Sequence, residues 1–444
     1  MGEPRRIVIM GAAGRDFHDF NMLFRSDADV TVVAFTATQI PGIDDRVYPP
    51  VLAGRRHPGG IPIRAEAALE EICREADVTD VVFAYSDVPY ATVMGAAARA
   101  QSVGAHFVLP SARSTMLAAE VPVIAVTAVR TGCGKSQVSR WIAGRLAERG
   151  LRTAAVRHPM PYGDLAKQAV QRFATEADLV AADCTLEERE EYEPYIARGL
   201  TVFAGVDYGA ILEQAQAESD VILWDGGNND TPFFRPDLHI VLADALRPGH
   251  ETRYYPGEVN LRMADIVVIA KSDVARDADV SAVRDAVSRI RPDVPVYRGG
   301  SPVRLDDPNA VKGKRVLVVD DGPTLTHGGM AYGAGFVAAQ AAGASEIVDP
   351  RPAAAPSLRA VFDAFPHLDR VVPAMGYGEA QRDALAKTIN GSGAEVVVAG
   401  TPIDLARNLD LELPVVRAHY DYADLDTPGL GDAIDTFLDG KGLR

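Results

Sequence analysis

One segment, residues 123–136, constrains the fold of this chain more than any other. An apolar, β-branched run, Val-Ile-Ala-Val-Thr-Ala, leads through Val129 into Arg-Thr-Gly-Cys-Gly-Lys-Ser, and a helical pattern follows to Arg149. A strand, a glycine loop and a helix in this order predict a phosphate-binding loop. Glycines let backbone N–H groups approach phosphate oxygens, and the positive end of the helix faces the same anion. The usual spacing has glycine at Val129, so the segment is a variant of this loop.

The side chains of the loop have predicted roles in nucleotide binding and catalysis. Lys135 is placed to reach the outer phosphates, and the Ser136 hydroxyl is placed to ligate Mg²⁺. The residues predicted to bind the nucleotide through this loop are Thr131, Gly132, Cys133, Gly134, Lys135, Ser136 and Gln137.

Segment 221–230, Val-Ile-Leu-Trp-Asp-Gly-Gly-Asn-Asn-Asp, is the second strong signal. Four apolar residues that end in Asp225, followed by two glycines, are typical of a Walker B strand, whose carboxylate holds Mg²⁺ or its water. Ser136 and Asp225 are therefore the predicted metal ligands. Asn228, in the loop that follows, is a candidate for substrate binding.

Other polar side chains follow predicted strands, and ligands of open α/β sheets bind at the carboxyl ends of strands. The loop after strand 152–157 carries Arg157 and His158, a cation for the acceptor and a proton carrier near neutral pH, although a lone histidine is more often structural. The residues predicted to act in catalysis are Lys135, Asp225, Arg130, Arg157 and His158. The further candidates for substrate binding are Arg15, Asp164, Arg247, Thr324 and His327.

Two segments leave alternatives open. The turn 11–16, which includes Arg15, is either an anion pocket or a simple tight turn, and the glycine-dense segment 321–335 is either a ligand cradle or a flexible connection. The charged run 184–193 predicts a capped, solvated helix that begins at Thr185.

A third motif concerns the choice of nucleotide. An apolar strand over 265–270 runs into Lys271-Ser-Asp273, and guanine-specific P-loop proteins carry Asn or Thr and then Lys-x-Asp at this place. Here the first position is Ala270, so the motif is incomplete. We expect Lys271 and Asp273 to bind the nucleotide, which we take to be ATP, with GTP as the alternative.

Strands and helices alternate along the whole chain, which predicts an α/β fold of three Rossmann-like or P-loop domains with mostly parallel sheets. We expect an N-terminal Rossmann-like domain over residues 1–118, a P-loop NTPase domain over 119–312 and a C-terminal α/β domain over 313–444. Each of these domains places loops at strand ends, which suits an enclosed site with several parts.

Composition narrows the class of protein. The formal net charge of −16 argues against general nucleic-acid binding. No run approaches the roughly 20 apolar residues of a membrane span, so we expect no membrane partner. Three scattered cysteines in 444 residues fit a reducing compartment and give no zinc spacing, which predicts a cytoplasmic protein.

Four segments, 10–18, 157–165, 224–230 and 321–330, together with a phosphate loop like that of dethiobiotin synthetase, resemble the cyclic 2,3-diphosphoglycerate synthetase family and its relatives labelled predicted GTPases. The resemblance extends over nearly all the chain. It implies a Mg²⁺- and NTP-dependent phosphoryl-transfer enzyme, a ligase or cyclase, that activates a small anionic metabolite, phosphorylated or carboxylic. In that chemistry an oxyanion attacks the γ-phosphate and a neighbouring nucleophile captures the activated species.

A regulatory or metallochaperone-type GTPase that acts on a protein partner is the alternative, because the P-loop group contains both classes. The chain lacks the His- or Cys-rich tract that such chaperones often carry, and its guanine motif is incomplete. Homodimers are common in this P-loop group, so we expect a homodimer by analogy.

Overall fold

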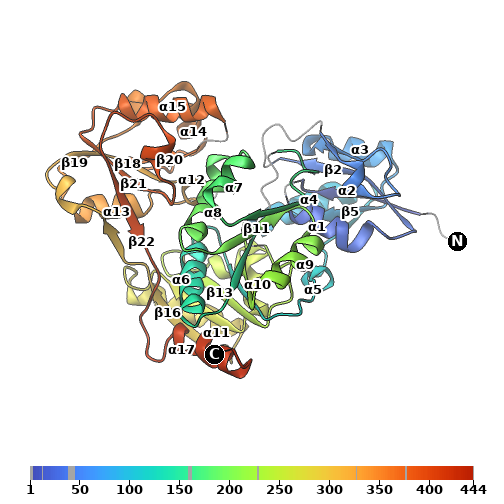
Figure 1. Ribbon diagram of the computed structural model, residues 1–444. Coiled ribbons are helices and arrows are strands. Elements are labelled where there is room, and N and C mark those ends of the chain that lie inside the picture. Colours follow the sequence, from blue (N-terminus) through green and yellow to red (C-terminus); the bar gives the residue numbers. More distant parts are fainter. Residues whose placement is uncertain are drawn as a thin grey trace.

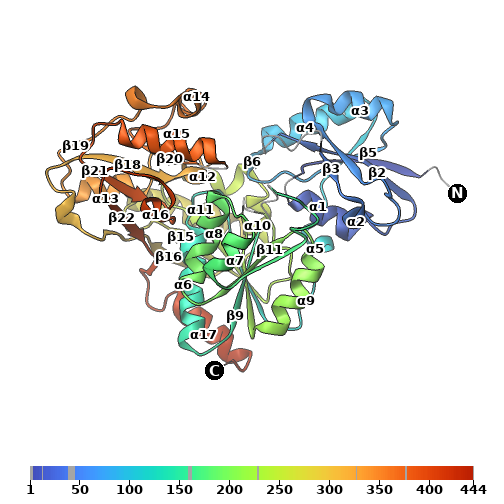
Figure 2. The same ribbon diagram turned by 45° about the horizontal axis from the view of Figure 1, so that its top comes forward.

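Three main sheets, mostly parallel, carry helices on their faces. The structure, a computed structural model, describes residues 4–12, 14–38, 46–158, 163–227, 230–326, 328–375 and 378–443. The first and third sheets lie on opposite sides of the central one in two views of the molecule (Figure 1; Figure 2). The predicted α/β class with mostly parallel sheets is confirmed. Within the described ranges, no helix is long and apolar enough to cross a membrane.

The first sheet has the order β3-β4-β2-β1-β5-β7, and its pairs are parallel except for β3 with β4 at one edge. Its β-branched strands are buried between helices, as in doubly covered parallel sheets. The strands are β1 (Arg5–Met10), β2 (Val30–Ala37), β3 (Val47–Tyr48), β4 (Ile61–Ala65), β5 (Asp80–Phe83) and β7 (His106–Val108). The α-helices are α1 (Arg15–Asp19), α2 (Pro50–Ala53), α3 (Leu69–Glu75), α4 (Tyr90–Ser102) and α5 (Ala112–Thr115).

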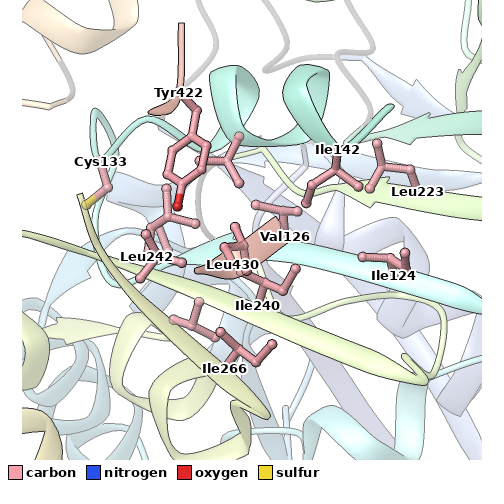
Figure 3. Close-up of a cluster of buried hydrophobic side chains, with 14 of the residues drawn as sticks. Ile124, Val126, Cys133, Ile142, Leu223, Ile240, Leu242, Ile266, Tyr422 and Leu430 are labelled. Carbon is pink, nitrogen blue, oxygen red and sulfur yellow. The ribbon is translucent and has the colours of Figure 1, made fainter. Parts of the chain in front are cut away.

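The central sheet has the order β10-β11-β9-β12-β8-β13-β15-β16-β23, with antiparallel pairs only at its two edges. Its middle strands are apolar and buried along their whole length, and they meet the core side chains seen in Figure 3. The strands are β8 (Val123–Ala128), β9 (Thr153–Arg157), β10 (Val170–Phe173), β11 (Thr201–Gly205), β12 (Val221–Asp225), β13 (Leu238–Asp244), β15 (Ile266–Ala270), β16 (Val296–Gly300) and β23 (Ala423–Asp424). The helices are α6 (Lys135–Glu148), α7 (Glu176–Ala181), α8 (Leu186–Ile196), α9 (Tyr208–Glu218), α10 (Gly257–Met263) and α11 (Asp277–Ile290).

The third sheet has the order β17-β22-β21-β18-β19, and β20 also pairs with β18. Only the β17–β22 pair is antiparallel among the pairs described. The strands are β17 (Val303–Leu305), β18 (Arg315–Asp321), β19 (Glu346–Ile347), β20 (Val372–Ala374), β21 (Val396–Gly400) and β22 (Val415–Tyr420). The helices are α12 (Gly322–Leu325), α13 (Ala334–Ala341), α14 (Pro356–Ala364), α15 (Glu379–Asn390) and α16 (Leu405–Asn408).

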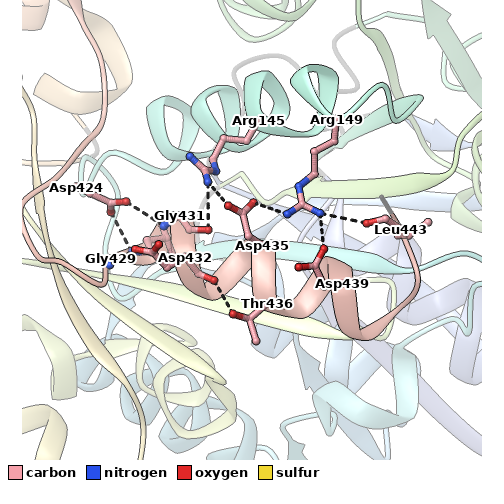
Figure 4. A network of polar contacts seen from close by, with 11 residues as sticks. Arg145, Arg149, Asp424, Gly429, Gly431, Asp432, Asp435, Thr436, Asp439 and Leu443 are labelled. Atoms are coloured by element: carbon pink, nitrogen blue, oxygen red, sulfur yellow. Dashed lines mark hydrogen bonds and ion pairs between the residues drawn. The ribbon is translucent and has the colours of Figure 1, made fainter.

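The last helix, α17 (Leu430–Gly440), returns from the third sheet to the central one. Its side chains Leu430, Ile434 and Leu438 are fully buried in the central core, and each contributes about 1.5–3 kcal/mol through burial. Beside these apolar side chains, Arg145 of α6 and Arg149, the residue after α6, form ion pairs with acidic residues of α17 (Figure 4). The last helix of the chain therefore forms part of the central core.

Strand pairing bears on the predicted division into domains, which stays a prediction. A two-stranded ribbon of β6 (Val88–Pro89) and β14 (Tyr254–Tyr255) joins the first and central units. β17 precedes residue 313 but pairs within the third sheet, whereas β23 and α17 follow residue 313 and lie with the central sheet.

Candidate active site

The phosphate loop lies between β8 and α6. Gly132 and Gly134 have φ angles of 80° and 101°, a region that favours glycine. The side chain of Lys135, the first residue of α6, is buried, and this burial lowers its pKa while the nearby Asp225 carboxylate opposes the change. Residues 129–134, between the buried strand β8 and the first residue of α6, thus form a loop at the positive end of the helix. An anion can bind at that end.

Two cations fix the loop through its carbonyl groups. Lys271 Nζ donates to the Gly132 carbonyl at 2.7 Å, and Arg247 donates to the Thr131 carbonyl at 2.8 Å. Both also contact Asp244 at 2.8 Å, and these charges hold its pKa below the ordinary value although burial acts in the opposite direction. Lys271 and Arg247 therefore support the loop from the ends of β15 and β13.

A residue of the first domain reaches the same loop. Asp87 forms an ion pair with Arg130 at 2.9 Å, and its Oδ1 atom accepts a hydrogen bond from the Thr131 N–H at 3.4 Å. The Arg130 guanidinium also lies 3.9 Å from the centre of the Tyr254 ring, which adds a cation–π contact. The loop is thus held by the first and the central domains together.

Asp225 ends β12 beside the loop and is completely buried. Its Oδ2 atom accepts a hydrogen bond from the Tyr195 hydroxyl at 2.6 Å and forms an ion pair with Arg157. Its Oδ1 atom has no hydrogen-bond partner among the residues that the structure describes. A buried carboxylate oxygen without a donor is costly, and it fits a cation that would complete the site.

The donor set suits Mg²⁺ bound together with phosphate. In the described part of the chain, no three or more His, Cys, Asp or Glu residues lie close enough together to hold a metal. Mg²⁺ commonly takes one or two protein oxygens and completes its shell with phosphate oxygens and water. Ser136 and Asp225 match that requirement, whereas a site built wholly from protein ligands does not.

The two residues after β9 have different surroundings. Arg157 is buried, and Asp225 and Glu191 raise its pKa against the effect of burial. His158 Nδ1 lies 2.6 Å from Asp230 Oδ2, and a Cβ atom on Gly227 would lie 2.6 Å from the His158 Cβ atom. The glycine after the β12 strand end therefore lets the backbone pass against His158.

A cavity of about 380 Å³ opens between the phosphate loop, α8 and the third sheet. Loop residues form one wall, Glu190 and Glu191 of α8 form a second, and Asp321, Thr324 and Tyr420 of the third domain form part of the opposite wall. Lys271, Val274 and Ser301 also line the cavity beside the loop, and Gln137 donates to the Ser301 hydroxyl at 2.7 Å. The Asp273 carboxylate accepts from the Ser301 N–H at 3.1 Å just outside.

The glycine-dense segment after β18 is held by hydrogen bonds to a buried carboxylate of that strand. The buried Asp320 carboxylate accepts N–H bonds from Gly333 at 2.8 Å and from Gly335 at 2.7 Å. Burial raises the pKa of Asp320 to about 6. A Cβ atom on Gly400 would lie 2.1 Å from Asp320 Oδ1, so these strands approach closely at this point. Its Thr324 lines the cavity wall.

The predicted site residues fall into two groups. Those that line the cavity are Thr131, Gly132, Gly134, Lys135, Ser136, Gln137, Arg157, Lys271 and Thr324. Those that lie behind its walls or beside it are Arg130, Cys133, Asp225, His158, Arg247 and Asp273.

Two of the candidates for substrate binding, Arg15 and Asp164, are not brought into the cavity. Arg15 donates to the Thr231 carbonyl at 3.1 Å at the junction of the first and central domains. The Asp164 carboxylate accepts the Ala166 N–H at 3.0 Å within its own turn. Asn228 and His327 lie outside the described residues.

Arg140, Glu190 and Tyr420 are among the residues of the cavity wall that sequence reasoning missed. The predicted cap of α8 at Thr185 is confirmed, but the predicted solvation of its charged face is wrong at Glu190, which is buried and accepts a hydrogen bond from Thr401. The third domain covers this face of α8. The charge run itself carries no signal of that cover.

Comparison with known proteins gives one relative of full length. Arginine synthetase ArcE of Thermococcus kodakarensis is 56% identical over 433 residues, which cover 98% of this chain and 97% of that protein. Cyclic 2,3-diphosphoglycerate synthetase of Thermococcus onnurineus is 31% identical over 99 residues, 22% of this chain and 23% of that protein. LpxK from Aquifex aeolicus, solved in complex with ATP, has a TM-score of 0.43 and 13% identity over 73% of this chain and 90% of its own.

No protein-family model matches the chain. The predicted resemblance to the cyclic 2,3-diphosphoglycerate synthetases is confirmed in part, because it appears in these comparisons over about a quarter of the chain and not over nearly all of it.

Proposed function

The chain belongs to the arginine synthetase ArcE family and is an enzyme of the ligase type, and we propose that it forms the guanidinium group of arginine with ATP as the energy source. The observation that carries the proposal is the cavity of about 380 Å³, in which the phosphate loop and polar side chains of α8 and of the third sheet line the same space. In this proposal the nucleotide occupies the loop end and the amino acid occupies the end toward the third sheet.

The chemistry requires activation of an oxygen. In the ureido analogue of arginine, one oxygen stands where arginine has a nitrogen, and that oxygen is a poor leaving group. It attacks the γ-phosphorus of ATP, and the bond to ADP breaks. Ammonia then attacks the ureido carbon, the C–O bond breaks, and phosphate leaves with the loss of one proton from nitrogen. The products are arginine, ADP and phosphate, and this phosphoryl transfer needs mainly positioning and charge stabilisation from the protein.

The residues divide this work between them. Lys135 and the N–H groups of the loop hold the phosphates, while Ser136 and Asp225 would hold Mg²⁺, which neutralises phosphate charge when bound. Tyr195 and Arg157 engage one oxygen of Asp225 and so direct its other oxygen to the metal. Glu190 and Asp321 bring carboxylates to the cavity wall, which favours a product that carries positive charge.

The cysteines favour free ammonia as the nitrogen donor. Release of ammonia from an amide by a cysteine nucleophile needs an accessible thiol with a low pKa. Cys73, Cys133 and Cys184 are all buried, and burial raises the pKa of each thiol, to about 12 at Cys184.

The test is a direct assay of product. The purified chain is incubated with Mg²⁺, ATP, the ureido analogue of arginine and ammonium, and arginine and ADP are measured by mass spectrometry. We expect one ADP for each arginine, and a higher rate with ATP than with GTP. ADP that forms at the same rate without the ureido compound would instead point to a regulatory NTPase.

Lys135→Ala provides the matched loss of function. Removal of the ammonium group leaves the outer phosphates without their main cation, so we expect arginine formation to fall by about 100-fold or more while the melting temperature stays close to that of the wild type. A variant that keeps its rate would remove the phosphate loop from the mechanism. The expected homodimer is tested separately by light scattering against the 47.4 kDa mass of one chain.

A further inference from the structure

A second cavity of about 410 Å³ lies beside the first, between α7, α8 and the end of β22. Three residues, Arg140, Pro402 and Tyr420, line both cavities. Arg140 comes from α6, the helix that begins at the phosphate loop, and it is 9% exposed. Its side chain thus stands on the wall between the candidate active site and the neighbouring space.

Arg140 differs from the other arginines of the second cavity. Arg407 donates to Glu176 at 2.7 Å, Arg198 donates to the Pro194 carbonyl at 2.8 Å, and Arg417 donates to the Pro402 carbonyl at 2.9 Å. Within the described residues, Arg140 has neither a hydrogen bond nor an ion pair. A guanidinium keeps its charge and presents five N–H donors in a fixed fork, so Arg140 offers an anion in these cavities a charged donor group.

The groups around Arg140 indicate where such an anion would lie. Arg140, Asp321 and Tyr420 line the same cavity, and the nearby Arg140 charge opposes the rise that burial causes in the pKa of Asp321 and of Tyr420. Asp321 Oδ2 accepts the Thr324 N–H at 3.1 Å, as the cap of α12, which engages one of its oxygens. A carboxylate carried by a ligand in the first cavity would supply the partner that Arg140 lacks among the described residues.

The position along α6 gives the length of that ligand. Arg140 follows Lys135 by five residues, a rise of roughly 7.5 Å along the helix axis at 1.5 Å per residue. An amino acid with a three-carbon side chain and a terminal ureido or guanidinium group has a similar reach from its carboxylate to its reacting carbon. A short acid would leave one of the two ends unfilled.

We propose that Arg140 binds the α-carboxylate of the amino acid substrate through a bidentate contact, and that this contact aligns the other end of the substrate with the phosphate loop. The inference rests on the proposed function, because it assigns the acceptor part of the same site. The ligand class is a long-chain α-amino acid with a polar terminal group.

The experiment measures binding by calorimetry in the presence of Mg²⁺ and ADP. The two probes are arginine and agmatine, which is arginine without its carboxylate. We expect the wild-type enzyme to bind arginine more tightly than agmatine by about 10- to 100-fold, the range of a charge-assisted contact. In Arg140→Gln the affinity for arginine falls to that for agmatine, and the affinity for agmatine changes by less than about threefold.

Two further variants keep the outcome clear. Arg140→Lys retains a charge without the fork, so it recovers part of the preference for arginine. Arg149→Gln, at the residue that follows the same helix, is outside both cavities and paired with α17, and it keeps the full preference. Affinity for ADP measured in each variant shows that the phosphate loop is still folded.

The results separate the two proposals. A wild-type enzyme that binds neither arginine nor agmatine overturns the proposed function together with this inference. A wild-type enzyme that prefers arginine, with the same preference in Arg140→Gln, leaves the proposed function standing and overturns the assignment of Arg140. Binding of inorganic phosphate that is lost in Arg140→Gln, together with an unchanged preference for arginine in that variant, would show that Arg140 binds a free anion instead of the substrate carboxylate.

Discussion

Asp225 and Asp320 both stand at the carboxyl ends of buried strands, one in the central sheet and one in the third, yet their oxygens are used differently. Asp225 keeps one oxygen without a donor in the described structure, while Tyr195 and Arg157 engage the other. Asp320 gives both oxygens to the N–H groups of Gly333 and Gly335. In sequence the two look alike, since an apolar run and nearby glycines accompany each. The difference indicates that the first carboxylate is open to a ligand and that the second holds two segments of backbone together.

Substitution of the two aspartates tests this comparison most strongly. Asp225→Asn removes the charge that we assign to Mg²⁺, so we expect arginine formation to fall by about 100- to 1000-fold and the requirement for Mg²⁺ to rise. Asp320→Asn should change the rate per folded molecule by less than about tenfold. Steady-state kinetics at several Mg²⁺ concentrations measure both, and equal losses in the two variants would contradict the division of roles.

Substitution of a glycine that lies close to each aspartate in space tests the same comparison between Asp225 and Asp320. In Gly400→Ala the new Cβ atom would lie 2.1 Å from Asp320 Oδ1 and 2.4 Å from the Gly335 nitrogen, so the backbone must shift. We expect the free energy of unfolding to fall by about 1–3 kcal/mol in denaturant titrations. Gly227→Ala instead displaces His158, and its main effect should be on turnover. Should Gly400→Ala prove as stable as the wild type, the close approach of these strands would be refuted.

The two sheets should respond to pH in opposite directions. Burial raises the pKa of Asp320 to about 6, so the folded protein keeps a proton that the unfolded chain has released, and this contribution to stability falls as pH rises from about 4 to 6. In the central sheet, burial lowers the pKa of His239 to about 4, so the unfolded chain binds the extra proton and this contribution falls as pH drops from about 6.5 to 4.

Unfolding titrations between pH 4 and 7 measure this contrast. The stability difference between wild type and Asp320→Asn should decrease with rising pH, whereas the difference between wild type and His239→Gln should increase. If both stability differences changed with pH in the same direction, the pKa of Asp320 or of His239 would not be shifted as burial predicts.

The smallest expected effect concerns the support of Asp225. Tyr195→Phe removes the hydroxyl that donates to Asp225 Oδ2 at 2.6 Å and keeps the ring. Because Arg157 still engages that oxygen, we expect the affinity for Mg²⁺ with ADP to weaken by only about three- to tenfold. Isothermal titration with Mg²⁺ gives the value. A loss as large as that of Asp225→Asn would mean that the hydroxyl itself acts at the site.

The sequence predicts those parts of the site that lie within one contiguous pattern. Residues 123–136 predict the strand, the loop and the helix start, because each depends on neighbours in the chain, and the α/β class follows from the same alternation elsewhere. The role that we assign to Arg140 depends on which sheet packs against α6, and the burial of Glu190 depends on Thr401, which lies 211 residues away in sequence. No local pattern carries that information. The return of α17 to the central core was also outside the predicted division at residue 313.

Because α17 is made last but packs in the central core, the order of synthesis affects how this core folds. As the chain leaves the ribosome, the first sheet and most of the central sheet appear early, and the third sheet follows. The central core includes Leu430, Ile434 and Leu438, so it stays incomplete until the final helix has emerged. Until then α6, which begins at the phosphate loop, exposes the apolar surface that α17 will cover. A ribosome stalled before residue 430 would therefore hold a nascent chain whose first sheet is finished and whose nucleotide-binding domain is still open to chaperones.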